Sequence, residues 1–169
     1  MDKITLSTQL SEQDFIKANF YLYFKKWNSK FTFGIGILAL LSGLFLFLTG
    51  ALEEVPWIGL IFGLYLTFGL PVQIYFAAKK GYRINKRMSE PMLYQFDQDN
   101  IQIKGDSFDS KLSWEKVYSV TETKAWILIW LTPQLANIVP KRDFSPEQLG
   151  LFKALVKEQK GPKNKLKPV

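Results

Sequence analysis

The sequence predicts an α+β membrane protein, in which a two-helix transmembrane hairpin is followed by a small antiparallel-sheet domain capped by a C-terminal helix. Three features predict this class: two long uncharged apolar runs, later segments of alternating polarity, and basic residues at the outer ends of the apolar runs. The chain has 169 residues, with 22 Lys plus Arg, 15 Asp plus Glu and a net charge of +7. It has no Cys and no His, which excludes thiol nucleophiles, imidazole bases and the usual Cys/His zinc sites.

Residues 1–30 are predicted to form an N-terminal strand and an amphipathic helix. Ile4 and Leu6 alternate with polar residues as in a strand, and Ser11 with Asp14 is typical of a helix start of the capping-box type. The helix carries an apolar, mainly aromatic stripe, made of Ile16, Phe20, Tyr23, Phe24 and Trp27. Three readings stay open: the stripe lies on the membrane surface, it packs against the C-terminal domain, or its helix simply continues into the first span.

Residues 31–78 are predicted to form the transmembrane hairpin, with spans at 31–52 and 55–78. Both runs lack charged residues, and at about 1.5 Å rise per residue each is long enough to cross a hydrocarbon core about 30 Å thick. A buried hairpin of a soluble protein would need a far larger protein around it. A cleaved signal peptide does not fit either, because 30 residues precede the first run. We therefore expect the first span to be retained as an anchor.

Charged residues around the spans predict the orientation. Basic residues lie before the first span and after the second, whereas only Glu53 and Glu54 lie between them. The positive-inside rule then places the protein in the cell (inner or cytoplasmic) membrane as a multi-pass protein with both termini cytoplasmic. The candidate contacts with the membrane surface or anionic lipid are Lys25, Lys26, Lys30, Lys79, Lys80, Arg83, Lys86 and Arg87. The predicted interfacial aromatics are Trp27, Trp57, Tyr75 and Tyr82.

Small residues within the spans predict close helix packing. Gly59 and Gly63 have a GxxxG spacing, and Ala39 with Gly43 has a small-xxx-small spacing. Packing within the hairpin is the favoured reading, and self-association through Gly59 and Gly63 is the alternative. Pro71 is expected to bend the second span. Neither span contains an ionisable Asp, Glu, Lys or Arg, which disfavours transport by the chain acting alone.

Residues 88–160 are predicted to form a cytoplasmic antiparallel-sheet domain. Alternating or apolar segments separated by turn residues predict strands near 94–96, 101–103, 108–112, 118–123, 125–131 and 137–139. A helix then begins at Ser145, where Pro146 at the first helical position and Gln148 complete the start signals. Residues 161–169 are rich in Lys and are expected to form a flexible basic tail.

This layout resembles the YcxB-like family of bacterial membrane proteins. The segments that carry the resemblance are Leu112-Ser113-Trp114-Glu115-Lys116-Val117 and Ile138-Val139-Pro140-Lys141-Arg142-Asp143-Phe144-Ser145. The resemblance implies a C-terminal domain of pleckstrin-homology-like (PH-like) fold, namely a bent antiparallel sheet capped by a C-terminal helix. It brings no catalytic residues.

The matching segments also have structural readings. Trp114 is expected to be a buried packing residue at a turn, and Lys141 and Arg142 are expected to be solvated rather than to touch anionic headgroups. A cluster of acidic residues follows the spans, at Asp97, Asp99, Asp106 and Asp109. These positions fall in predicted turns, where Asp is common, and their spacing does not match an EF-hand loop. The turn reading is therefore preferred to a metal site or a carboxylate enzyme.

The favoured function is a non-enzymatic, membrane-anchored interaction module that presents a PH-like domain at the cytoplasmic face. The alternatives are a membrane protein that recognises anionic lipid and a subunit of a larger membrane complex. The expected partners are the lipid bilayer, a protein of unknown identity and a second copy of the chain, with no nucleic acid. The sequence predicts no catalytic residue, no cofactor and no metal site, because it lacks a phosphate-binding glycine loop and a nucleophile-base pair.

Overall fold

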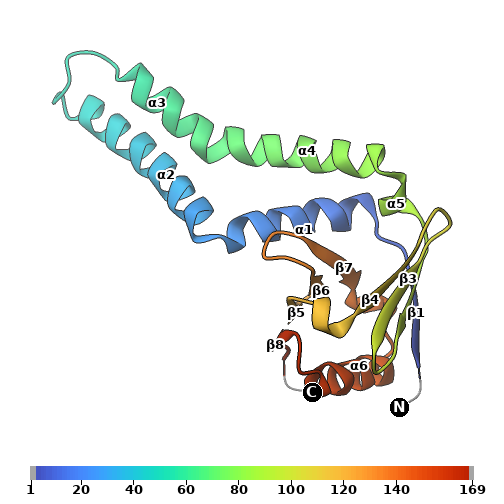
Figure 1. Ribbon diagram of the computed structural model, residues 1–169. Helices are drawn as coiled ribbons and strands as arrows, with labels where there is room; N and C mark the ends of the chain where they lie inside the picture. Colours follow the sequence, from blue (N-terminus) through green and yellow to red (C-terminus); the bar gives the residue numbers. More distant parts are fainter. Residues whose placement is uncertain (1–2, 168–169) are drawn as a thin grey trace. The chain divides into compact units, whose positions relative to one another are not determined.

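Two separate stretches of sequence build one unit of this protein. The computed structural model describes residues 3–167 and divides into two compact units, one comprising the chain up to Asp14 and from Tyr82 on, the other Phe15–Gly81. We call these the sheet domain and the helical hairpin (Figure 1). The elements are two mainly antiparallel sheets and two apolar helices, which confirms the α+β part of the predicted fold class.

The first sheet of the sheet domain combines strands from both ends of the hairpin. Its order is β1 (Ile4–Thr8), β2 (Met92–Phe96), β3 (Asn100–Lys104) and β4 (Asp109–Ser113), all antiparallel. Leu6 lies opposite Tyr94, and Ile4 opposite Phe96. The sequence predicts a strand at the N-terminus but assigns it to a separate part of the chain. The structure differs, because β1 completes the sheet and the whole hairpin is inserted between two neighbouring strands.

The second sheet has the order β7 (Ala136–Pro140), β6 (Trp126–Trp130), β5 (Ser119–Glu122) and β8 (Lys163–Lys165). Its first three strands are antiparallel, whereas β8 runs parallel to β5. The expectation of a flexible tail over 161–169 is therefore wrong for 163–165, which pair with β5. Residues 168 and 169 lie outside the described residues.

Helix α6 (Pro146–Glu158) closes the core between the sheets. Its start is the predicted capping box, since the Ser145 hydroxyl accepts from the backbone N–H of Gln148 and the Gln148 side chain accepts from the backbone N–H of Ser145. Phe152 of α6 packs against Phe96 of β2 with ring centroids 4.8 Å apart. The short 3-10 helices η2 (Trp114–Lys116) and η3 (Lys141–Asp143) connect strands and helix. Trp114 is buried and donates its indole N–H to the Asp97 carbonyl, as expected of a packing residue.

The helical hairpin has two helices before its loop and one composite helix after it. Helix α1 (Glu12–Lys25) breaks at Lys26, which has extended backbone, and α2 (Trp27–Leu48) begins anew. After the loop, α3 (Trp57–Leu64), the π-helix η1 (Tyr65–Gly69) and α4 (Leu70–Ile84) are continuous, and α5 (Lys86–Ser89) follows in the sheet domain. Two helices, Trp27–Leu48 and Trp57–Ile84, are long and apolar enough to cross a membrane.

Glycines let the two apolar helices approach closely. A Cβ on Gly36 would lie 2.7 Å from the Thr67 hydroxyl oxygen, and one on Gly63 would lie 2.9 Å from the Gly36 carbonyl oxygen. Gly43 faces Leu60. Gly59 has no atom within 4 Å of such a Cβ, so the predicted packing role within the hairpin is wrong for Gly59 and is taken by Gly36. Ala39 is half-buried.

The second apolar helix departs from α geometry immediately before Pro71. Proline lacks a backbone N–H, and its ring clashes with the carbonyl four residues earlier, which here is that of Thr67. The π-helix η1 spans this residue. The departure from α geometry therefore includes the position whose carbonyl the proline ring would meet, and the bend expected at Pro71 stays a prediction.

Candidate functional site at the roots of the hairpin

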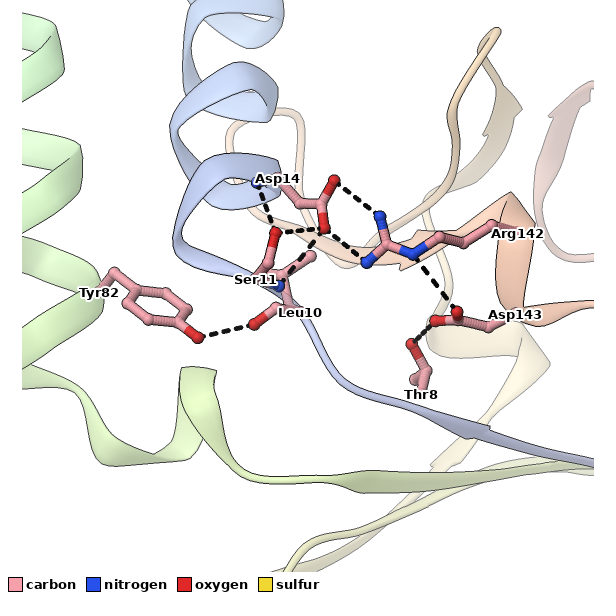
Figure 2. A network of polar contacts seen from close by, with 7 residues as sticks. All are labelled: Thr8, Leu10, Ser11, Asp14, Tyr82, Arg142 and Asp143. Carbon is pink, nitrogen blue, oxygen red and sulfur yellow. Dashed lines mark hydrogen bonds and ion pairs between the residues drawn. The ribbon is translucent and has the colours of Figure 1, made fainter.

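The segments that lead into and out of the helical hairpin belong to the sheet domain and are tied to each other. The Tyr82 hydroxyl donates to the Leu10 carbonyl oxygen at 2.7 Å (Figure 2). One residue further along α4, Arg83 Nε donates to Glu12 Oε2 at 3.0 Å. The tyrosine contact is a specific link between chain segments 72 residues apart, and the interfacial anchoring of Tyr82 stays a prediction.

Asp14 links the start of α1 to the junction between β7 and α6. Arg142 donates from both terminal guanidinium nitrogens to the two carboxylate oxygens of Asp14, at 3.1 and 2.6 Å (Figure 2). The same carboxylate accepts from the Ser11 hydroxyl at 2.6 Å, while the Ser11 hydroxyl oxygen accepts from the Asp14 backbone N–H. This is the predicted helix start, with an added long-range ion pair.

The electrostatics of this contact follow from its surroundings. Burial alone would raise the pKa of Asp14, but hydrogen bonds from Arg142 and Ser11 outweigh it and hold the pKa below its ordinary value. The same pairing raises the pKa of Arg142. Asp14 is therefore a carboxylate at neutral pH, and its charge is matched by a two-point hydrogen-bonded guanidinium.

Asp143 extends the network to the end of β1. Arg142 Nε lies 3.6 Å from Asp143 Oδ1, and the Thr8 hydroxyl donates to Asp143 Oδ2. We call Thr8, Leu10, Ser11, Asp14, Tyr82, Arg142 and Asp143 the root network (Figure 2). Its members come from the β1–α1 segment, the end of α4 and η3, so the points where the hairpin joins the sheet domain are fixed to one another.

Lys141, beside the root network, belongs to a second polar cluster in the sheet domain. Its Nζ lies 2.5 Å from Glu122 Oε1, and Lys153 Nζ lies 3.0 Å from Glu122 Oε2. The Glu122 side chain is only 1% exposed. We call Glu122, Lys141 and Lys153 the Glu122 cluster. Burial would raise the pKa of Glu122, but the hydrogen bonds from Lys141, Lys153 and the Lys167 backbone lower it overall.

These contacts correct the prediction of solvation for Lys141 alone. Both residues form ion pairs within the sheet domain, one with Glu122 and the other with Asp14, but the Lys141 side chain is 23% exposed, whereas that of Arg142, at 56%, is solvated as predicted. Arg142 is 128 residues from Asp14 in the sequence. No local pattern signals such a pair, since it depends on how β1 and η3 meet in the folded domain.

The predicted basic contacts fall into two groups. Lys25, Lys26, Lys30, Lys79 and Lys80 belong to the hairpin, where Lys79 Nζ lies 5.7 Å from the Tyr75 ring centroid. Arg83 and Arg87 belong to the sheet domain, where Arg83 pairs with Glu12 and the Arg87 guanidinium lies 5.4 Å from the Phe108 ring centroid. The Lys86 side chain lies outside the described part of the structure. Trp27 and Trp57 are exposed, 78% and 65%.

The acidic residues after the spans have structural contacts. Asp97 Oδ1 accepts from the backbone N–H groups of Asp99 and Asn100, at 3.0 and 2.6 Å, which is an Asx turn between β2 and β3. Asp109 accepts from the Gln102 side chain. Within residues 3–167, no group of three or more Asp, Glu, His or Cys is placed to hold a metal ion.

Comparison with known proteins gives one match. No curated protein and no solved structure matches the chain. The family model described as YcxB-like protein matches residues 96–156. This range runs from the end of β2 into α6 and includes both segments that carry the resemblance seen in the sequence. The resemblance to the YcxB-like protein family is therefore confirmed for residues 96–156.

Proposed function

We propose that this chain is an integral protein of the cytoplasmic membrane that holds a PH-like domain at the cytoplasmic face to bind another protein, without catalysing a reaction. One observation carries the proposal: an exposed apolar hairpin is inserted between two paired strands of a small sheet domain. Such a domain is joined to its anchor at two points rather than one.

The dimensions of the helices support membrane insertion. The 22 residues of Trp27–Leu48 and the 28 of Trp57–Ile84 correspond to lengths of about 33 and 42 Å at about 1.5 Å per residue. Both exceed a hydrocarbon core of about 30 Å, so the longer helix would cross with tilt or extend beyond it. Large apolar side chains such as Leu38, Ile58 and Phe62 are exposed along them, as expected of lipid-facing residues.

The charge pattern supports the proposed orientation. Glu53 and Glu54 are the only charged residues between the apolar helices, whereas Lys25, Lys26 and Lys30 flank one outer end and Lys79 and Lys80 the other. Positive flanks face the cytoplasm. The sheet domain, which contains both termini of the chain, would then lie on the cytoplasmic side.

The PH-like assignment is supported by the parts of the sheet domain. Strands β1 to β4 and β5 to β7 form two antiparallel groups, and α6 packs on the core that they share. This agrees with the antiparallel sheet and C-terminal helix that the family resemblance implies. Because fold and function separate readily, phosphoinositide binding does not follow from this shape.

Site-specific photocrosslinking in living cells tests the proposal. A photoreactive amino acid at the exposed positions Lys111 or Lys124 of the sheet domain should give discrete heavier adducts, identified by mass spectrometry. The same group at Glu54, in the loop between the helices, is the matched control and should give none. Absence of specific adducts from every sheet-domain position would contradict the interaction module, and adducts mainly from the apolar helices would favour a subunit of a larger membrane complex.

Anionic-lipid recognition is the second candidate, supported by the cations between Lys79 and Arg87. Juxtamembrane cations gain about 1 kcal/mol each near an anionic leaflet. Two of these cations already have protein partners, since Arg83 pairs with Glu12 and Arg87 lies over Phe108. Changing Lys79, Lys80, Lys86 and Arg87 to Gln should abolish any enrichment of anionic lipid around the reconstituted protein. Unchanged enrichment and salt dependence would rule this candidate out.

A further inference from the structure

Strand β8 covers the edge of β5. The side chains of β8 contribute little to this pairing, because they are exposed. Strand β8 has three residues, Lys163, Asn164 and Lys165, all exposed, and parallel pairing is slightly weaker per residue than antiparallel pairing. The backbone N–H of Lys163 donates to the Tyr118 carbonyl oxygen at 3.3 Å. Without β8, β5 would present unpaired backbone groups, which is a template for strand addition.

A buried ion pair binds the backbone just beyond β8. Glu122 Oε2 accepts from the backbone N–H of Lys167 at 2.9 Å, and Lys153 Nζ donates to the carbonyl oxygen of the same residue at 3.4 Å. Glu122 and Lys153 also pair with each other, and their side chains are 1% and 7% exposed. Both backbone groups of one residue are therefore bound by two side chains of the sheet domain.

Stability alone does not account for this ion pair. Burying two charges costs desolvation energy, and apolar residues of similar volume often stabilise a core as well or better. An ion pair has a distinct use where an extended backbone must be bound, because the carboxylate takes the N–H and the ammonium takes the C=O. The Glu122–Lys153 pair has both of these contacts with Lys167.

Only some side chains of the tail take part in its binding: Pro162 is buried, whereas Lys163, Asn164 and Lys165 are exposed. Leu166 packs against the hydrophobic core, and the ammonium of Lys163 lies 6.0 Å from the Tyr118 ring centroid. Gly161 passes so close to η2 that a Cβ there would lie 2.8 Å from the Trp114 carbonyl oxygen. The recognised chemistry is thus an extended backbone with a cationic residue three positions before a leucine-like residue.

We propose that the β5 edge, together with Glu122 and Lys153, is an exchangeable strand-binding site. Residues 163–167 occupy the site in this structure, and an extended segment of a partner protein, with a Lys or Arg three positions before a leucine-like residue, replaces them. The inference deepens the proposed function and rests on it for its biological use, since it names the surface through which the module binds. Exchange itself is measured on purified protein, so its failure would leave the crosslinking result untouched.

The probe is a fluorescent peptide with the sequence of residues 161–169, GPKNKLKPV, added to the full-length chain in detergent. The substitutions Lys163→Pro and Leu166→Asp together release the resident tail, because they remove its backbone donor to Tyr118 and place a charge at its apolar anchor. The released variant should bind the peptide, measured by fluorescence anisotropy. Wild-type protein should bind at least about tenfold more weakly, because its own tail competes at high effective concentration.

Variants of the peptide test the recognised chemistry without disturbing the protein. N-methylation at the Lys167 position removes the donor to Glu122 and should weaken binding about tenfold or more, as expected for a hydrogen bond to a charged group. N-methylation at the Asn164 position is the matched control and should leave the affinity unchanged, because alternate N–H groups of a strand point away from its neighbour. Equal loss with both peptides, or no binding by a released variant that keeps its near-ultraviolet circular dichroism, would overturn the proposal.

Hydrogen exchange on the wild-type chain covers the case in which the released variant does not fold. If the tail exchanges with an incoming strand, the amides of Lys163 and Lys167 should open locally and exchange much faster than those of Ile127 and Ile129 in β6. Equal protection of the two sets would mean that the tail opens only when the whole domain unfolds. That result would overturn the proposal.

Discussion

Arg142 binds both carboxylate oxygens of Asp14, at 3.1 and 2.6 Å, and so joins η3 to the start of the helix that leads into the hairpin. The two residues lie 128 positions apart in the sequence, and the residues of the helical hairpin fall within this interval of the chain. Within the sheet domain, the start of α1 is therefore held against η3 by a specific polar contact as well as by chain connectivity.

The Asp14–Arg142 pair should contribute measurably to stability. Arg142 is 56% exposed, so solvent screens the pair, and we expect a coupling energy of about 1 kcal/mol from a double-mutant cycle of Asp14→Asn and Arg142→Gln. The cycle of Glu12→Gln and Arg83→Gln is the matched control. That pair is more exposed and has one hydrogen bond, and it should show a smaller coupling. Denaturant unfolding in detergent measures both, and a larger coupling for the control pair would contradict this account.

Acid should destabilise the sheet domain through Asp14 and Glu122. Both have a pKa below the ordinary values of 3.8 and 4.5, so the unfolded chain binds more protons than the folded one at low pH. Their stabilisation is full above the ordinary values and is lost as pH falls through the lowered values. The melting temperature, measured from pH 7 to pH 3, should therefore fall most steeply at the lowest pH values.

The variant Asp14→Asn tests this cause directly. Its melting temperature should be lower than that of wild type at pH 7 and should then fall less on acidification. If the melting temperatures of wild type and Asp14→Asn fell in parallel with pH, Asp14 would not be the cause of the acid destabilisation.

Removing the charge of Glu122 should be far more damaging than removing that of an exposed glutamate. Glu122→Gln leaves Lys141 and Lys153 without their shared carboxylate, and breaking a buried pair costs about 3 to 5 kcal/mol. Glu158 is exposed at the end of α6, so Glu158→Gln should change stability by less than about 0.5 kcal/mol. Similar losses in urea unfolding for the two variants would refute the structural role of the Glu122 cluster.

Close packing in the hairpin predicts that replacing glycine by alanine destabilises the protein at some positions and not at others. Gly36→Ala and Gly63→Ala should each cost about 1 to 3 kcal/mol, because the new methyl groups would meet Thr67 and the Gly36 backbone. Gly34→Ala and Gly59→Ala should cause no loss, since an added Cβ meets nothing within 4 Å at either position. Thermal unfolding in detergent ranks the four variants. Destabilisation by Gly59→Ala equal to that by Gly63→Ala would point to an interface between copies instead.

Local patterns in the sequence predict most of the elements. The uncharged runs indicate both apolar helices, and Ser145 with Gln148 indicates the start of α6. Alternation at Ile4 and Leu6 indicates a strand, but its partner β2 lies beyond the hairpin, and no local pattern encodes that pairing. The first apolar helix, α2, begins at Trp27 rather than at the predicted Phe31, because polar residues such as Asn28 and Ser29 also adopt helical geometry.

The polar contacts of the candidate site are less predictable from the sequence. Residues 161–167 contain one large aliphatic side chain, Leu166, so their composition indicates a flexible tail. The strand forms because β5 offers backbone groups and Glu122 binds the Lys167 backbone. Contacts of this kind depend on the folded positions of distant elements, as does the pairing of Arg142 with Asp14.

The central claim is that the hairpin crosses the membrane and leaves the sheet domain on the cytoplasmic side. Because the chain has no Cys, single cysteines introduced at Lys3, Glu54 and Lys111 can be labelled without background by a membrane-impermeant maleimide. In sealed right-side-out vesicles of an expressing bacterium, only Glu54→Cys should react, and in inside-out vesicles only Lys3→Cys and Lys111→Cys. Labelling of all three from the same side, or release of the protein from the membrane by alkaline carbonate, would contradict the account.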